Sequence, residues 1–534
     1  MVRKGVFVMS FSRLNRSDAT HTRSRTPASV SPFSGMCTTC LDGCLGTCEI
    51  GKSAIRGPEC IYPQPFGEIT AASEKDYPID FSHFNIMGSA AGAFGVPADS
   101  EHAVFTNVNL ETSIGAENPI KLKLPFIVPG LGSTDVAKRN WDGLAVGVAI
   151  SGCLLTIGEN VCGMDDDGIV ENGRIKKSPD MEKRIKTFRE WQLEGYGDIA
   201  VQFNVEDTNL GVPRYVIEEL GVETVELKWG QGAKDIGGEV KLRTLEKAKS
   251  MKAKGYIVLP DPDDPESEEA FRSGAIKEFE RHSRLGMVTE EGFASAVQEL
   301  RDMGAKRVFL KTGAYRPRDL AKAVKYASDN KIDLLTVDGA GGGTGMSPWR
   351  MMNEWGIPTV ELCCLTYEYV NYLSSQGKHV PSIAFAGGIT LEDQIFKAIA
   401  LGAPFVKAVG MSRSTLAAAM VGKTVGEQIV KGEVPKSLEK YGKSMDEIFY
   451  TAVHLRDTYG EEFERLHPGA IGVYSYYQRL AQGLRQLMAG ARKFSLEYIT
   501  RDDLCALTRD ASEVSGIPYV TEVDRDEAWE IIKG

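Results

Sequence analysis

The chain has 534 residues, enough for one large domain with additions or for two to three domains with a deep core. Its 62 basic and 73 acidic side chains give a formal net charge of −11, which argues against nucleic acid or an anionic membrane as the main partner. The longest uncharged run, Gly143 to Gly158, is interrupted by glycines and too short to span a membrane, and no signal peptide is recognisable. We therefore expect a cytoplasmic protein.

The amino-terminal part of the chain divides into a tail and a cysteine-rich segment. Residues 1–34 are rich in Arg, Ser and Thr without apolar periodicity, and we expect a flexible tail there. Residues 35–116 follow as a loop-rich segment that contains five of the ten cysteines. These five are Cys37, Cys40, Cys44, Cys48 and Cys60.

The spacing of these cysteines, C-x2-C-x3-C-x3-C, is compact and rich in glycine. Disulfides are not expected in a large chain without an export signal. The pattern favours an iron–sulfur cluster, because soft thiolates suit iron and four of them offset the positive charge of the cluster. Structural zinc is the alternative, although it usually takes two well-separated C-x2-C pairs. A four-iron, four-sulfur cluster needs only four thiolates, so Cys60 can replace one of the other four.

From Pro125 onwards, short apolar strands alternate with helical patterns such as Glu290 to Met303 and Pro317 to Ser328. The predicted strands are Pro125–Pro129, Leu154–Gly158, Ile199–Phe203, Thr224–Lys228, Arg307–Lys311, Asp333–Val337, Ser382–Ala386 and Phe405–Val409. Eight strands separated by helices predict an α/β fold, a (β/α)8 TIM barrel, over residues 117–436.

Two further regions interrupt or follow the predicted barrel. The long gap between the fourth and fifth strands, Gly230 to Gly304, indicates an insertion or lid. Residues 437–534 are predicted to form a helical extension packed on the barrel, with helices over Met445 to Tyr459, Tyr474 to Met488 and Asp524 to Ile532.

Glycine-rich turns follow the last three predicted strands. Val337 to Pro348 reads V-D-G-A-G-G-G-T-G-M-S-P, and glycines also end Ser382 to Gly388 and Phe405 to Gly410. Backbone without side chains can come close to a phosphate or a flat ring, so these turns indicate a ligand cradle on the C-terminal rim. A plain tight loop between strand and helix is the alternative.

The chain resembles the FMN-binding domain of glutamate synthase. The segments that carry the resemblance are Val225 to Gly237, Val308 to Thr312, Val337 to Pro348 and Ala384 to Gly410, in the order and spacing of that domain. Arg485 to Gly516 resembles its tail, so the likeness covers roughly Lys121 to Gly516. It implies a barrel that holds FMN, receives electrons through an iron–sulfur cluster and reduces the imine formed from 2-oxoglutarate and ammonia.

The resemblance assigns a role to particular residues. Lys311 would stabilise negative charge on the reduced flavin. Lys228, Gln231 and Lys234 would bind the carboxylates of the oxo acid, with Lys228 also counted as catalytic. Glu159 would admit ammonia or move a proton. The residues expected to bind the cofactor are Gly130, Ser133, Lys311, Gly342, Gly343, Thr344, Gly345, Gly387, Gly388 and Gly410. Each charged residue could instead be an ordinary side chain at the barrel rim.

The chain also departs from the family. No cysteine follows Gly410 where the family keeps a three-iron centre, so the amino-terminal cysteines are the candidate replacement. An amidotransferase domain is not recognisable, so ammonia is expected from solution or from a separate amidotransferase subunit. We expect an oligomeric oxidoreductase that makes L-glutamate with electrons from ferredoxin. The alternatives are an N-methylglutamate synthase-like subunit that uses methylamine, and an electron-transfer subunit of a larger complex.

Overall fold

The computed structural model describes residues 54–55, 73, 75–232, 236, 239–342 and 347–534. Eight parallel strands close into a barrel in which β9 pairs with β13 to complete the ring. The strands are β4 (Phe126–Leu131), β5 (Leu154–Ile157), β8 (Asp198–Phe203), β9 (Thr224–Lys228), β13 (Arg307–Thr312), β14 (Leu334–Asp338), β15 (Ser382–Ala386) and β16 (Val406–Gly410). All eight strands predicted from the sequence are confirmed, with ends that differ by at most two residues.

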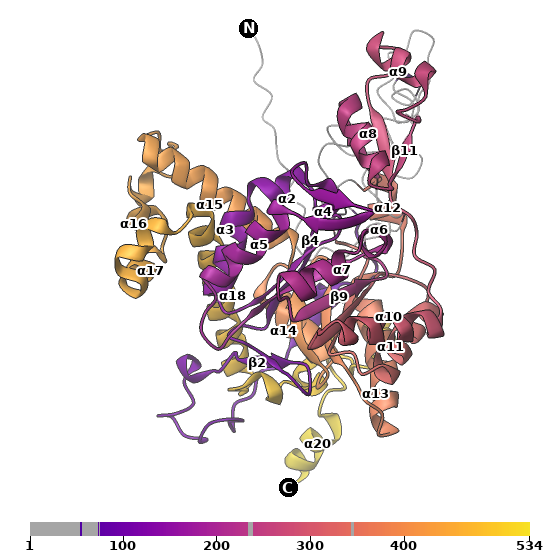
Figure 1. Cartoon of the computed structure of the whole chain (residues 1–534). Helices are drawn as coiled ribbons and strands as arrows, with labels where there is room; N and C mark the ends of the chain where they lie inside the picture. Colours follow the sequence, from indigo (N-terminus) through magenta and orange to yellow (C-terminus); the bar gives the residue numbers. More distant parts are fainter. Residues whose placement is uncertain (1–53, 56–72, 74, 233–235, 237–238, 343–346) are drawn as a thin grey trace, which may run out of the picture.

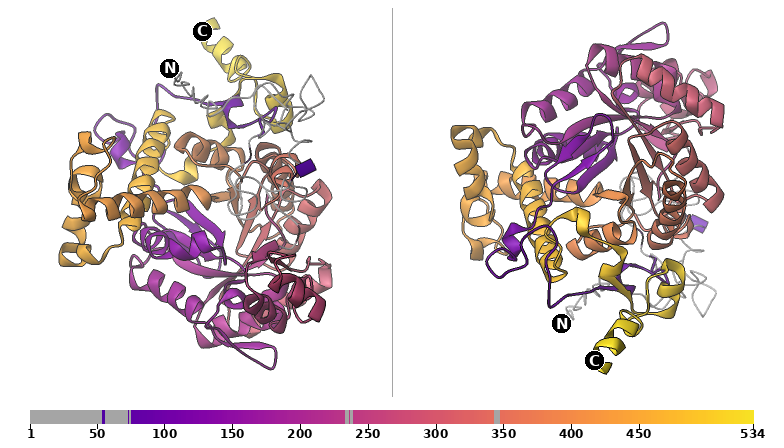
Figure 2. Two further views of the ribbon diagram at one scale, coloured as in Figure 1. Left: turned by 90° about the horizontal axis from the view of Figure 1, so that it is seen from above. Right: turned by 90° about the horizontal axis from the view of Figure 1, so that it is seen from below.

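Helices surround this barrel and bury the outer faces of the strands (Figures 1 and 2). They include α2 (Asp135–Arg139), α3 (Trp141–Ile150), α4 (Val161–Met164), α5 (Pro179–Glu190), α6 (Val205–Leu210), α7 (Val212–Arg214), α10 (Glu290–Asp302), α11 (Pro317–Asp329), α12 (Trp349–Glu354), α13 (Thr359–Ser375), α14 (Glu392–Leu401) and α15 (Arg413–Lys431). The apolar side chains of α10, Phe293, Val297 and Leu300, follow the helical repeat and face the core. Because both faces of each barrel strand are covered, the strands are almost continuously apolar.

A hairpin closes the bottom of the barrel. Strands β2 (Thr112–Ile114) and β3 (Ile120–Leu122) pair antiparallel, and three of their side chains join the interior cluster of the barrel. That cluster consists of Ile114, Ile120, Leu122, Ile127, Leu154, Ala200, Phe309, Leu334, Ala384 and Ala408. The plug leaves the C-terminal ends of the strands as the end at which a ligand site can form.

An insertion, defined here as residues 239–284, follows β9 and rises above the barrel (Figure 1). Its elements are β10 (Glu239–Leu242), α8 (Leu245–Ala253), β11 (Ile257–Leu259), α9 (Pro265–Arg272) and β12 (Phe279–His282). The three strands form an antiparallel sheet in the order β10–β12–β11, with a small apolar core of its own. The segment is therefore a folded unit.

The C-terminal region is helical, as expected, but its first helix is divided. The structure has α16 (Met445–Ile448) and α17 (Ala452–Tyr459), because Phe449 adopts an extended conformation and buries its ring in a separate apolar cluster. Helix α18 (Pro468–Gly490) packs on α15 and α3. Helices α19 (Arg509–Ser515) and α20 (Arg525–Lys533) end the chain, and α20 projects from the body of the molecule (Figure 2).

An early and a late segment of the described chain pair in a small sheet. Strand β1 (Phe84–Ile86) is antiparallel to β17 (Leu504–Ala506), although the two are far apart in the sequence. Two short hairpin strands, β6 (Ile169–Glu171) and β7 (Arg174–Lys177), complete the strands. None of the described helices is long and apolar enough to cross a membrane.

Candidate functional site

A polar layer fills the barrel interior above its apolar cluster. Successive side chains of a strand alternate between the two faces, so residues two positions beyond the interior cluster also point inward. The inward-facing polar residues are Thr156, Gln202, Glu226, Lys228, Lys311, Thr336 and Asp338. They come from five adjacent strands, β5, β8, β9, β13 and β14, and make one half of the barrel mouth polar and charged.

Lys311 lies at the centre of this half. Its ammonium is 3.1 Å from Asp338 Oδ2, and the residue is 4% exposed. Burial would lower the pKa of Lys311, but the charges of Asp338 and Glu226 outweigh it, so the net pKa is raised. Lys311 is therefore a protonated, buried cation with two carboxylates beside it.

The carboxyl of Glu226 is held deeper in the same layer. Gln202 donates its amide N–H to Glu226 Oε1 at 2.5 Å, and both residues are almost fully buried. Burial raises the pKa of Glu226, although Lys311 and the Gln202 hydrogen bond oppose the effect. The other amide atom, Gln202 Oε1, has no hydrogen-bond partner among the described residues, and neither has Thr336 Oγ1.

Glu159, Lys228 and Gln231 meet at the rim. The Lys228 ammonium lies 2.6 Å from Glu159 Oε1 and 3.2 Å from Gln231 Oε1. Burial would raise the pKa of Glu159, but the charge of Lys228 outweighs it and the net pKa is lowered. The Lys228 and Glu159 side chains are 12% and 24% exposed, so an entering ligand can reach the pair.

The other half of the mouth consists of small residues. Ala386 and Gly410 end the strands β15 and β16, Pro129 lies two residues before the end of β4, and all three face inward. A Cβ added to Gly410 would come within 2.6 Å of Pro129 Cγ and 2.8 Å of Ala386 Cβ. Gly387 has a φ of 120° and packs so tightly that a Cβ would lie 2.6 Å from Gly339 O. This half therefore presents backbone to a ligand.

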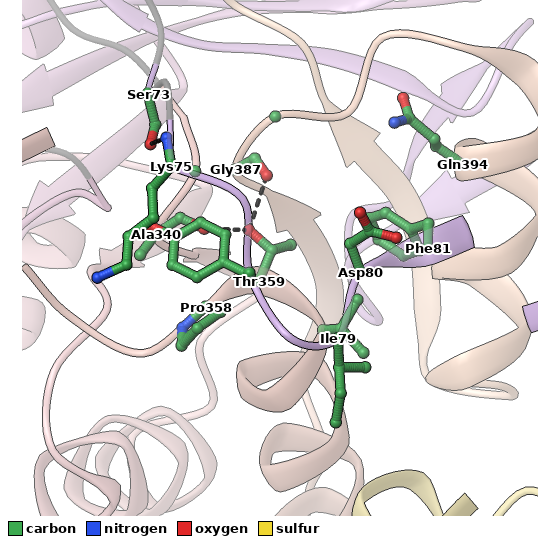
Figure 3. A pocket seen from close by; sticks show the side chains of 14 residues that line it. Ser73, Lys75, Ile79, Asp80, Phe81, Ala340, Pro358, Thr359, Gly387 and Gln394 are labelled. Atoms are coloured by element: carbon green, nitrogen blue, oxygen red, sulfur yellow. Dashed lines mark hydrogen bonds between the residues drawn. The ribbon is translucent and has the colours of Figure 1, made fainter. Parts of the chain in front are cut away.

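A cavity of about 160 Å³ lies behind the glycine loops (Figure 3). One wall is an N-terminal strap, residues 75–81, whose Tyr77 ring approaches Gly341. The other wall is the start of α13, where the Thr359 hydroxyl donates to Gly387 O at 2.7 Å and Ala340 O at 3.0 Å. Lys75 ties the strap to Glu354 of α12 at 2.6 Å. The strap thus supports the loops that were predicted to hold a phosphate.

These features fit the FMN that the sequence resemblance implies. The flavin ring has a polar edge that would need partners, and two buried polar atoms have none among the described residues. They are Thr336 Oγ1, on the residue paired with Lys311 across β13 and β14, and Gln202 Oε1, whose side chain bonds Glu226. A phosphate needs backbone N–H groups, which the turns at Gly387, Gly388 and Gly410 can offer. One half of the barrel mouth is charged and the other is lined by small residues, which suits a flat ligand with one polar edge.

Several of the residues expected from the sequence cannot be placed. Lys234, Gly343, Thr344 and Gly345 lie outside the described residues, and so do all five amino-terminal cysteines. Within the part of the chain that the structure describes, three or more His, Cys, Asp or Glu side chains nowhere gather as metal ligands would. The described cysteines, Cys153, Cys162, Cys363, Cys364 and Cys505, are buried and unpaired.

Of the residues expected from the sequence, Glu159, Lys228 and Gln231 are brought together, and Lys311 occupies the neighbouring strand. Gly342, Gly387 and Gly388 adjoin one another, since a Cβ on Gly342 would be 3.4 Å from Gly387 Cα. Gly130, near the end of β4, lies against Gln202, and Ser133 lies in the loop between β4 and α2.

Sequence reasoning missed Gln202, Glu226 and Asp338. The signal was available, because Gln202 is the single polar residue of I-A-V-Q-F, and Glu226 lies between the apolar Val225 and Leu227 in T-V-E-L-K. A buried polar side chain in such a strand needs a partner and is often functional.

Comparisons with known proteins agree with the sequence resemblance. Residues 281–421, which include β13 to β16, match the family model described as the conserved region in glutamate synthase. A glutamate synthase large subunit-like protein of Rhizobium meliloti (strain 1021) is 25% identical over 425 residues, covering 77% of this chain and 81% of that protein. The glutamate synthase large subunit-like protein YerD of Bacillus subtilis (strain 168) is 28% identical over 199 residues, covering 35% and 32%. These matches support a relationship to glutamate synthases.

The similar solved structures are more distant. The flavin-binding domain of baker's yeast flavocytochrome b2 has a TM-score of 0.45 and 14% identity, covering 85% of this chain and 81% of that chain. Mandelate oxidase with (S)-2-phenylpropionate has a TM-score of 0.42 and 14% identity, covering 79% and 86%.

Proposed function

We propose that this chain is an FMN-dependent oxidoreductase of the glutamate synthase type, which aminates a 2-oxo acid reductively. The substrate proposed first is 2-oxoglutarate, with L-glutamate as product. The observation that carries the proposal is the pairing of Lys311 with Lys228 on adjacent strands, in a barrel mouth whose opposite half is glycine and other small residues. The family match over residues 281–421 supports it.

FMN would lie across the mouth with its phosphate at the glycine turns. Gly387, Gly388 and Gly410 would approach the phosphate with backbone N–H groups, together with the Gly342 to Gly345 turn. Lys311 and Gln202 would meet the polar edge of the ring, and Gly130 and Ser133 would lie beside it. When bound, FMN supplies the hydride that the amination needs and accepts electrons singly. Lys311 favours negative charge at that edge because it is a buried, protonated cation.

The oxo acid would bind at Lys228, Gln231 and Lys234. A carboxylate that reaches the Lys228 ammonium competes with Glu159 for the same cation, so substrate binding would loosen the ion pair between them. Ammonia and the oxo acid lose water to form an imine, and the addition of a hydride and a proton to the C=N bond gives the amino acid. Net charge balances when two electrons and two protons are consumed.

Glu159 would bind the ammonium ion and accept its proton. While Lys228 holds it, its pKa is lowered and the carboxylate is charged, which suits an ammonium ion at the rim. Once the substrate takes over Lys228, the pKa of Glu159 rises and the carboxylate can accept the proton that turns ammonium into nucleophilic ammonia.

The electrons would arrive from ferredoxin through a four-iron cluster held by four of Cys37, Cys40, Cys44, Cys48 and Cys60. These residues lie outside the described part of the chain, so the cluster rests on their spacing and on the chemistry. The names of the two relatives, both large subunit-like, support a partner subunit as a further element of the proposal. Cytoplasmic location and an oligomeric state remain expectations from the sequence.

Turnover of the purified holoprotein tests the proposal. We would denature anaerobically prepared protein, identify the released flavin, and then assay a panel of 2-oxo acids with ammonium or methylamine and reduced ferredoxin. Release of FMN and formation of L-glutamate from 2-oxoglutarate and ammonium support it. An N-methylated product from methylamine favours the N-methylglutamate synthase alternative, and reduction of the flavin without any product favours an electron-transfer subunit. Protein that binds FAD or no flavin overturns the assignment.

A further inference from the structure

Basic side chains of the insertion hold it on the barrel through hydrogen bonds, and we call the barrel residues that the insertion contacts the seat of the insertion. Lys254 donates to the carbonyls of Gly163 at 3.0 Å and Asp165 at 2.6 Å, and Lys247 donates to Met164 O at 2.8 Å. At the other end of the insertion, Arg284 pairs with Glu206 at 2.8 Å. The insertion therefore contacts the barrel at defined positions, on α4 and its C-cap and at the start of α6.

Asn160 is the polar centre of this seat. It has a left-handed backbone with φ 65°, which is costly for a residue with a side chain unless neighbours fix it. Its backbone N–H donates to both oxygens of Asp207, at 3.2 and 3.0 Å. Its side-chain Oδ1 accepts from the Tyr256 hydroxyl of the insertion at 3.1 Å. One contact comes from the barrel and the other from the insertion.

The Tyr256 hydroxyl fills space that is free because residue 163 is a glycine. A Cβ added to Gly163 would overlap that hydroxyl, so only glycine at this position lets the ring enter. Tyr256 is 4% exposed, and the Arg281 guanidinium lies over its ring, 4.9 Å from the ring centroid. The ring is thus held by close packing and directs its hydroxyl at Asn160.

Glu159 immediately precedes Asn160, and the residue before it, Gly158, is also held in place. Gly158 and Gly132 touch backbone to backbone, with Gly158 N donating to Leu131 O at 2.9 Å. The carboxylate that pairs with Lys228 therefore projects from a residue whose two neighbours are both anchored. Lys228 ends β9, and the same strand leads through residues 229–238 into the insertion. The insertion is thus connected to both members of the ion pair.

We propose that Tyr256 is a positioning residue: through Asn160 it couples the seat of the insertion to the orientation of Glu159 against Lys228. The inference rests on the proposed function of Glu159. Loss of the hydroxyl removes the hydrogen bond from the insertion to Asn160, which keeps its bonds to Asp207 and the α4 bond from Met164 N to Asn160 O at 3.0 Å. The Glu159 backbone then gains freedom, and the ion pair at the rim becomes less well defined. The effect should fall on the amine step and leave FMN binding unchanged.

Tyr256→Phe tests the coupling because it removes one oxygen and keeps the ring. The free energy of one hydrogen bond corresponds to a rate change of about 2–12-fold. We therefore expect kcat with ammonium to decrease by a factor in that range and the pH profile of kcat to shift. Tyr215→Phe is the matched control, because the Tyr215 hydroxyl is also buried and bonded, donating to Glu182 at 2.8 Å, but touches neither Asn160 nor Glu159. FMN content and Tm are measured for both variants.

Asn160→Gly gives a second, independent variant. Glycine accepts the left-handed backbone without strain and removes only the side-chain acceptor, so it should reproduce the effect of Tyr256→Phe. The double variant should be no worse than either single one, because both remove the same hydrogen bond. If Tyr256→Phe does not fold, Asn160→Gly alone decides.

Glu159→Gln separates the two hypotheses. If that variant keeps full turnover, the proposed role of Glu159 is wrong. If Glu159→Gln loses turnover while Tyr256→Phe and Asn160→Gly keep the wild-type kcat, KM and pH profile, the coupling is wrong and the contact only holds the insertion in place. A lower Tm without a kinetic change would likewise mean that the contact serves stability alone.

Discussion

Lys228 and Lys311 occupy paired positions on the neighbouring strands β9 and β13, yet each meets a different carboxylate. Lys228 binds Glu159 at the rim, and Lys311 binds Asp338 inside the barrel. Glu226 adds a third negative group beside them. Two adjacent ammonium groups can be tolerated in a partly dry site because these carboxylates separate their charges. In the proposed function, the inner lysine would serve the cofactor and the outer lysine the substrate.

Replacement of Lys311 by Met should make the flavin harder to reduce while FMN still binds. The variant keeps the length of the side chain but removes a buried cation, a loss on the order of 2–4 kcal/mol in the reduced state. The measurement is the midpoint potential of bound flavin by spectroelectrochemistry, with Lys325→Met as a control at an exposed lysine. An unchanged potential in the Lys311 variant would rule out this role.

Gly387→Ala should release FMN. The new Cβ would collide with the Thr359 hydroxyl and Gly339 O, and the φ of 120° disfavours any side chain. Gly377→Ala is a matched control, because Gly377 also has a positive φ of 67° but nothing lies within 4 Å of its Cβ position. Both variants place a side chain at a positive φ, but only Gly387→Ala adds a collision and a φ beyond the left-handed region, so a difference in flavin content after gel filtration reports the surroundings of Gly387. Equal FMN content in the two proteins contradicts the predicted phosphate site.

Asp207 should make stability depend on pH. Burial raises its pKa to about 7, although backbone hydrogen bonds from Asn160 and Asn204 oppose the shift. Glu159, Cys162, Glu206, Tyr256 and Arg281 are the other ionisable groups around it. The unfolded chain releases this proton near pH 4 and the folded one near pH 7, so the group's contribution to the free energy of unfolding falls as the pH rises between these values.

Asp207→Asn should remove this part of the pH dependence, because the amide cannot ionise but still accepts a hydrogen bond from Asn160. The Tm difference between variant and wild type should therefore move in favour of the variant between pH 5 and pH 8. Asp167→Asn, at an exposed aspartate, serves as the control. Parallel Tm curves for Asp207→Asn and wild type would show that Asp207 does not titrate in this range.

The amino-terminal cysteines should hold a redox-active cluster. Iron and acid-labile sulfide should each be near four per chain, an expectation from the ligand chemistry of a four-iron cluster. Cys40→Ser or Cys44→Ser should abolish flavin reduction by ferredoxin and leave reduction by dithionite possible. Cys505→Ser, a buried cysteine outside the segment, should change neither. One zinc and no iron in anaerobically prepared protein would make the segment a structural clip.

The sequence predicted the barrel well because each strand is an apolar run bounded by turn residues, and parallel strands need such runs. The sequence also places Glu159, Lys228 and Lys311 at or just beyond the ends of predicted strands, and the ends of parallel strands meet at one rim of a barrel. It could not show that Tyr256 contacts Asn160, because the two residues are 96 positions apart and no local pattern joins them. The division of the Met445 to Tyr459 helix was also missed, since it depends on where Phe449 finds its apolar cluster.

The pairing of β1 with β17 has a practical consequence for anyone who expresses this protein. The strap at residues 75–81 ends just before β1, and it touches the turn at Gly341. A shortened clone that stops after α18 deletes β17, leaves β1 without its partner, and loosens the strap that directly precedes β1. If a preparation trimmed at the C-terminus loses its cofactor, the cause would then be the loss of the β1–β17 pairing that holds residues 75–81 in place.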